Sequence, residues 1–254
     1  MKNFLILLLC VPVMGLCQTS EPLIFEIVTM NVGKADASHV ENAMGAHNKK
    51  YHPSGPSGVR VYTVESGEDA GAYKWVMGPG PWSALDNRPD DPAHNSDWED
   101  NVDRYLEPGE DVEYIRFDPS RSRFPADFNV SKLWVQQIDV ARGKMDEMKA
   151  LLTKLQKVFA EKLPGQSYGI YYNELPSTSS GKDITIVYFF DKYAWLGIDD
   201  GLDAKYDEVY GKGSNEAFWN EWRENTVSVE TEIWEYDADL SGMPALVKAA
   251  ERQK

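Results

Sequence analysis

Residues 98–101 read WEDN, and residues 222–225 read WREN. Each stretch precedes a segment in which apolar and charged residues intermix, VEYIRFD at 112–118 and TEIWEYD at 231–237. The patterns upstream of each stretch also come in the same order: strand, amphipathic helix, two strands, helix. The chain is therefore predicted to carry two copies of one β-α-β-β-α-β unit.

The correspondence extends through the first helix of each copy. A constant offset of 108 residues aligns two apolar stripes spaced at three- and four-residue steps. The first stripe is Val40, Ala43, Met44, His47 and Tyr51, and the second is Met148, Leu151, Leu152, Leu155 and Phe159. We interpret this as an internal duplication, with the first copy at 22–119, a linker at 120–130, the second copy at 131–238 and a tail at 239–254.

Residues 1–17 have the pattern of a signal peptide: Lys2, an apolar run and then small residues near the expected cleavage site before Gln18. The protein is therefore expected to be exported, to the periplasm or beyond the cell. The alternative is lipidation of Cys17, although Leu16 stands where a small residue is preferred. Both cysteines of the chain, Cys10 and Cys17, fall in this leader, so the mature domain has no thiol for disulfides or nucleophilic catalysis.

Composition limits the classes of partner. The formal net charge of −15 disfavours nucleic acids and anionic membrane surfaces, both of which need clustered cations on the protein. Beyond the leader no run is long and apolar enough to span a bilayer, so an integral membrane protein is not expected. We expect a monomer or a weak dimer.

A β-α-β-β-α-β unit forms a four-stranded antiparallel sheet with both helices on one face. The strand predicted at 184–190 (ITIVYFF) is apolar on both faces and therefore needs cover on both. Two sheets facing each other, with helices outside, supply that cover. This arrangement resembles the dimeric α+β barrel superfamily of ferredoxin-like proteins, here as a fused pseudo-dimer. Its relatives include the antibiotic-biosynthesis monooxygenase, NIPSNAP and chlorite dismutase types.

The two copies differ on the first helix, where Ala43 and His47 stand in place of two leucines. Removing apolar volume from an inward stripe is costly unless something fills the space. We therefore predict a small-molecule pocket between helix and sheet in the first copy, with the ligand-binding residues His47, Tyr51, Tyr62, Trp75 and His39. The alternative is that His47 is a core histidine with structural hydrogen bonds and that aromatic neighbours fill the space.

The sequence gives only weak indications of a metal site or a cofactor. His39 and His47 are eight residues apart, whereas chelation from one helix favours a four-residue step. Haem ligation by a lone helical histidine, as the chlorite dismutase resemblance implies, has no supporting motif around it. The acidic stretches 86–97 and 199–203 lack the ligand spacing of a calcium loop. We predict no metal site and no cofactor.

Two functions stay open. The first is an exported small-molecule-binding or interaction module whose pocket lies in the first copy. The second is a cofactor-independent, monooxygenase-like enzyme, in which a His/Tyr pair steers proton transfer on a small aromatic substrate that itself reacts with oxygen. No catalytic residue can be nominated, because the chain has neither a Gly-x-Ser-x-Gly elbow nor a phosphate-binding Gly-Lys-Thr loop.

Overall fold

A computed structural model describes residues 21–88, 91–109, 111–124, 126–177 and 180–249. The predicted signal peptide at 1–17 lies outside these residues. Among the helices described, none is long and apolar enough to cross a membrane.

Both halves contain the predicted order of strands and helices. In the first half the elements are β1 (Ile24–Met30), α1 (Ala37–Tyr51), β2 (Val59–Ser66), β3 (Tyr73–Gly80), α2 (Trp82–Asp86), α3 (Pro92–Asn101), η1 (Asp103–Tyr105) and β4 (Asp111–Phe117). In the second half they are β6 (Lys132–Val140), α4 (Met145–Lys162), β7 (Tyr168–Asn173), β8 (Ile184–Phe190), η2 (Tyr193–Gly197), α5 (Leu202–Tyr210), α6 (Ser214–Asn225) and β9 (Thr226–Asp237). Two short strands, β5 (Phe128–Asn129) and β10 (Leu246–Val247), pair with each other.

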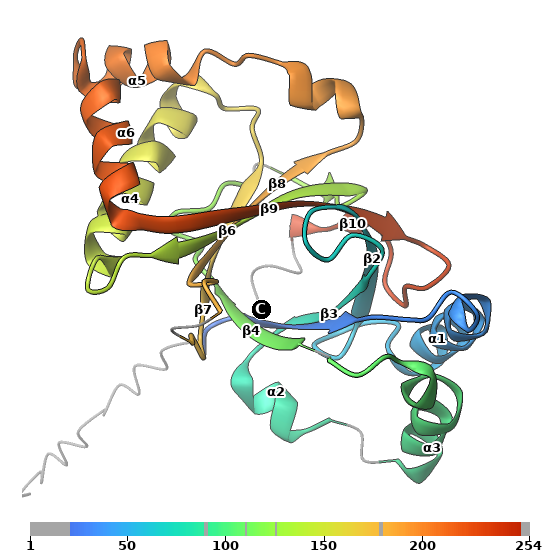
Figure 1. The fold of residues 1–254 in the computed structure, drawn as a ribbon. Helices are drawn as coiled ribbons and strands as arrows, with labels where there is room; N and C mark the ends of the chain where they lie inside the picture. Colours follow the sequence, from blue (N-terminus) through green and yellow to red (C-terminus); the bar gives the residue numbers. More distant parts are fainter. Residues whose placement is uncertain (1–20, 89–90, 110, 125, 178–179, 250–254) are drawn as a thin grey trace, which may run out of the picture.

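The eight long strands close into one barrel. Their order is β1-β3-β2-β9-β6-β8-β7-β4, so each half contributes four adjacent strands in the ferredoxin-like arrangement. The halves join where β2 pairs with β9 and where β4 pairs with β7. Figure 1 shows α4, α5 and α6 on the outside of one half and α1 and α3 on the outside of the other. The predicted fold class, two ferredoxin-like repeats fused into an α+β barrel with external helices, is confirmed.

Apolar side chains gather in three layers. One cluster fills the barrel interior, and the other two lie between each sheet and its helices. In the second half the layer under α4 is packed with leucines and aromatic rings, including Leu151, Leu155 and Phe159. In the first half the corresponding layer contains Met44 and Trp75. The site described below lies beside this first-half layer.

Two long connections between strands contain helices. After β3 come α2 and α3, and the N-cap of α3, Asp91, accepts a hydrogen bond from the Ala93 backbone N–H and is followed by Pro92. After β8 comes α5, ahead of α6. In the tail, β10 pairs with β5.

The segment after β9 lies between α1 and β2, against buried residues of α1. Gly45 lies under it, so closely that a Cβ atom at this position would be 2.4 Å from the carbonyl oxygen of Asp239. The Asn48 side chain donates to the Leu240 carbonyl at 2.8 Å, and the Ser241 hydroxyl accepts from the Val61 backbone N–H at 2.8 Å. Part of the space vacated by small residues on α1 is therefore occupied by the protein's own C-terminal segment.

Candidate functional site: a histidine pocket in the first half

His47 lies on the inward face of α1 and is 1% exposed. Its Nδ1 lies 2.8 Å from a carboxylate oxygen of Asp97 on α3. A carboxylate accepts, so Nδ1 carries the proton and Nε2 keeps a lone pair. The contact also joins α1 to α3.

His52 follows the last residue of α1 and is also buried. Its Nδ1 donates to the backbone carbonyl of Ser57 at 2.7 Å. Its Nε2, which therefore has a lone pair, lies 3.2 Å from Nε2 of His94 on α3.

The three imidazoles form one cluster. Their ring centres are 4.8 Å apart for His47 and His94, 5.3 Å for His47 and His52, and 5.2 Å for His52 and His94. One nitrogen from each ring lies within 4.8 Å of one nitrogen from each of the others. A small electrophile or a hydroxyl group placed among them would meet several nitrogen atoms at once.

Burial favours the uncharged forms of His47 and His52. It lowers the pKa of His52 to about 4, although the hydrogen bond to the Ser57 carbonyl acts in the opposite direction. Burial also lowers the pKa of His47, opposed by the hydrogen bond to Asp97. Both side chains are therefore neutral imidazoles that can accept a proton or bind a Lewis acid.

A cavity of about 250 Å³ opens beside these rings. Its apolar walls are Val28, Trp75, Met77, Trp98 and Val112. Its polar lining is made of the three histidines together with Ser57, Glu26 and Arg88, the last two of which form an ion pair. The Trp75 indole N–H donates to the Asn48 side chain at 3.1 Å, which holds this wall in place. The pocket thus combines aromatic walls with imidazole nitrogens.

Of the five predicted ligand-binding residues, three lie in or beside the cavity and two lie elsewhere. His47 and Trp75 line the cavity. Tyr51 contacts the rings of His47 and His94, with centre distances of 4.8 and 4.7 Å. His39 lies away from the cavity, exposed and tilted against the Tyr105 ring at a centre distance of 4.3 Å, because it is two helical turns from His47 on α1.

Tyr62 was predicted to line the pocket under α1, but it lines the barrel interior instead. On β2 it pairs with Lys74 of β3, whereas its neighbour Val61 pairs with Trp75. Successive side chains on a strand point to opposite faces, so Tyr62 faces the barrel interior while Trp75 faces α1.

Three further residues of the histidine pocket, His52, His94 and Asp97, were not predicted from the sequence. His52 lies just past the end of α1, and the other two lie on α3, between β3 and β4. The sequence signal that could have found them is the pair Asp91-Pro92, a helix start that puts His94 and Asp97 three residues apart on one helix.

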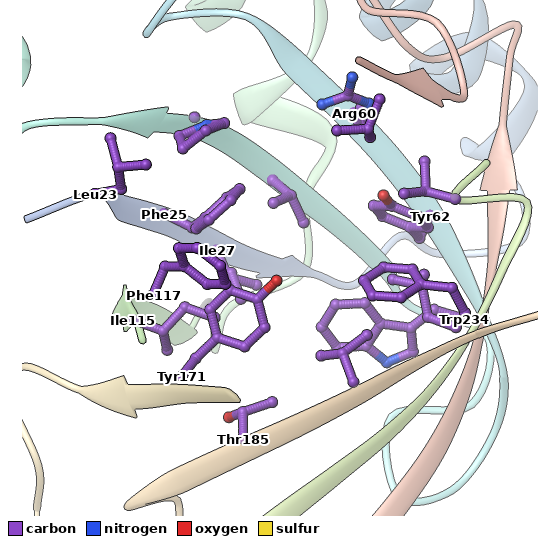
Figure 2. A pocket seen from close by; sticks show the side chains of 18 of the residues that line it. Leu23, Phe25, Ile27, Arg60, Tyr62, Ile115, Phe117, Tyr171, Thr185 and Trp234 are labelled. Atoms are coloured by element: carbon purple, nitrogen blue, oxygen red, sulfur yellow. The ribbon is translucent and has the colours of Figure 1, made fainter. Parts of the chain in front are cut away.

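A second cavity, of about 100 Å³, lies inside the barrel. Figure 2 shows Tyr62, Trp234, Tyr171 and Phe25 around it, with Thr185 at its lower edge. An eight-stranded barrel is just wide enough for side chains to fill. The cavity is a small space left among the aromatic and aliphatic side chains of the barrel core.

Comparison with known proteins gives the fold but no close relative. No protein-family model matches the chain, and no curated protein matches it. A structure titled as a proposed monooxygenase from Lactobacillus acidophilus is 12% identical, with 90% of this chain and 97% of that chain covered and a TM-score of 0.53. A second proposed monooxygenase, from Fusobacterium nucleatum, is 10% identical, with 85% and 93% covered and a TM-score of 0.55. A mutant chlorite dismutase from Candidatus Nitrospira defluvii is 12% identical, with 87% and 93% covered and a TM-score of 0.53.

The structural similarities and the closed barrel indicate the same fold. The chain has the fold of the dimeric α+β barrel superfamily, with both ferredoxin-like halves in one polypeptide. Structures of the monooxygenase and chlorite dismutase types share this fold.

The first-half pocket does not fit a haem group, which the chlorite dismutase resemblance would imply. An axial histidine needs a flat, open space for the macrocycle beyond its nitrogen. The His47 ring is instead surrounded by the rings of Tyr51, His52, His94 and Trp98, with centre distances of 4.8 to 5.3 Å.

Proposed function

We propose that the chain is a monooxygenase-like enzyme that binds a small aromatic substrate in the cavity beside His47. The observation that carries this proposal is the cavity itself, which is lined by two tryptophan rings and by the imidazoles of three histidines. The similarity to proposed monooxygenases favours the enzyme over an interaction module that makes no use of the cavity.

The size of the cavity indicates the size of the substrate. An apolar cavity of about 150 Å³ binds benzene, and drug-sized ligands occupy pockets of roughly 300–1,000 Å³. At about 250 Å³ the pocket suits a molecule of one or two rings. Trp75 and Trp98 provide faces for ring contacts, which prefer offset or edge-to-face geometry.

The polar side of the pocket suits a hydroxylated ring. A phenolic hydroxyl directed at the histidine cluster can donate to Nε2 of His47, while Asp97 holds the imidazole by its Nδ1–H. Proton removal makes the ring electron-rich, and such a ring reacts with oxygen without a separate reductant. For 1-naphthol the products would be 1,4-naphthoquinone and water: one oxygen atom enters the ring, and the second leaves with two substrate hydrogens.

Replacing His47 by leucine is expected to lower the rate of 1-naphthol oxidation by about 100-fold or more, since general-base catalysis contributes roughly that factor. The rate is measured as oxygen consumption with an electrode. Binding is measured separately, from quenching of tryptophan fluorescence by 1-naphthol under argon.

His39→Leu is the matched control, because His39 lies on the same helix but outside the pocket. Absence of saturable quenching in the wild-type protein, or an unchanged rate in the His47→Leu variant, would contradict the proposal. Saturable binding without oxygen consumption would instead support an exported small-molecule-binding module. Export itself rests on residues 1–17 and is checked by whether the secreted chain begins at Gln18.

A further inference from the structure

We propose that His47, His52 and His94 bind one zinc ion, with the fourth coordination position open to the cavity. Nothing in the spacing of these residues along the chain indicates such a site, because they come from α1, the residue after it, and α3. The inference replaces the expectation of a metal-free pocket.

The distances among the rings are close to those of a tetrahedral site. Zinc–nitrogen bonds of about 2.0–2.1 Å at tetrahedral angles place two ligand nitrogens roughly 3.3 Å apart and two ring centres roughly 5 Å apart. The Nε2 atoms of His52 and His94 are already 3.2 Å apart. The three ring-centre distances lie between 4.8 and 5.3 Å. Zinc binding would need only side-chain adjustments to bring the third nitrogen in.

The groups around the histidines are those of a prepared metal site. Ligating histidines usually donate their other ring N–H to a carboxylate or a backbone carbonyl, which fixes the tautomer and directs the free nitrogen at the metal. Here His47 donates to the Asp97 carboxylate and His52 to the Ser57 carbonyl. Both Nε2 lone pairs are therefore available.

The surroundings of His94 also favour a zinc site. Its Nδ1 is buried and has no hydrogen-bond partner among the described residues. That nitrogen lacks a partner with or without zinc, so the informative observation is the contact of 3.2 Å between the two Nε2 atoms: without a cation, His94 must donate there to the lone pair of His52. With zinc at Nε2 of both residues, the short contact between them is that of two ligands on one ion.

The ligand set and the adjoining space define the kind of site. Three imidazoles suit zinc, and three protein ligands with an open fourth position are typical of catalytic rather than structural zinc. The open position would face the cavity of about 250 Å³. A role in catalysis, in which zinc rather than His47 receives the substrate hydroxyl oxygen, rests on the proposed function, whereas zinc binding does not.

The test is isothermal titration of zinc chloride into the full chain, purified without a histidine tag and treated with EDTA, which is then removed. The wild-type protein is expected to bind one zinc ion. His94→Gln is expected to weaken the affinity by about 100-fold or more, and Asp97→Asn by about 10- to 100-fold, the usual range for loss of an outer-shell partner. His39→Gln, at a position outside the cluster, is expected to leave the affinity for zinc unchanged.

His94 is partly exposed near the start of α3, so its replacement should leave the fold intact, and thermal unfolding in EDTA checks this. Failure of the wild-type chain to bind zinc at one equivalent, or equal affinity in a folded His94→Gln variant, overturns the site. Quenching by 1-naphthol in the presence of EDTA tests the proposed function separately. A wild-type chain that binds 1-naphthol but no zinc would overturn only the metal site, and one that binds zinc but no 1-naphthol would overturn only the substrate proposal.

Discussion

The Lys74→Met variant is expected to be less stable than the wild-type protein by about 3–5 kcal/mol in free energy of unfolding, the usual cost of removing one partner of a buried ion pair. The Lys74 side chain is 1% exposed and its Nζ lies 3.0 Å from the Thr29 hydroxyl. It also forms ion pairs with Asp69 and with Glu232, whose side chain is 4% exposed. Methionine has a similar shape but would leave the Glu232 carboxylate buried without a cation.

Urea unfolding followed by tryptophan fluorescence measures this loss. Lys154→Met is the matched control: it breaks an exposed pair with Glu221, and such pairs contribute about 0–1 kcal/mol. Equal losses in the two variants would show that burial does not strengthen the Lys74 interactions. Adding Glu232→Gln to Lys74→Met should restore part of the stability, because the amide needs no counter-ion.

The Gly45→Thr variant is expected to lose about 3 kcal/mol, at the upper end of the usual range for overpacking. Threonine is the residue that the second copy has at this position, Thr153. In the first copy a Cβ atom would approach the Asp239 carbonyl oxygen to 2.4 Å, so the C-terminal segment must move. Threonine has a better helix propensity than glycine, but the gain, at most about 1 kcal/mol, is smaller than this loss.

Ala46→Lys is the matched control for Gly45→Thr. It also introduces the second-copy residue, Lys154, but at an exposed position of α1, where substitutions usually change stability by less than about 0.5 kcal/mol. Thermal unfolding of both variants is the measurement. Gly45→Thr should also weaken the pocket, because Gly242 of the same segment packs against the backbone of His52. Wild-type stability in Gly45→Thr would mean that the segment is not held against α1.

The histidine cluster shows why the site was predicted only in part. His47 was found because it breaks a leucine stripe, a signal that lies within one helix. His94 and Asp97 join it from α3, and the approach of α3 to α1 is a tertiary contact with no counterpart in local spacing. Tyr62 was misplaced because pairing register, which decides the face of a strand residue, depends on the partner strand.

The sequence by itself determined the architecture, because the helical and strand periods of two aligned copies recur along the chain and each reflects one buried face. It also pointed to the first half as the one with space, through Ala43 and His47. Only the tertiary structure decided what occupies that space: the C-terminal segment over Gly45 on one side, and three histidines around a cavity on the other. The physical reason is that periodicity reports which side of an element is buried, whereas a site depends on which distant elements meet there.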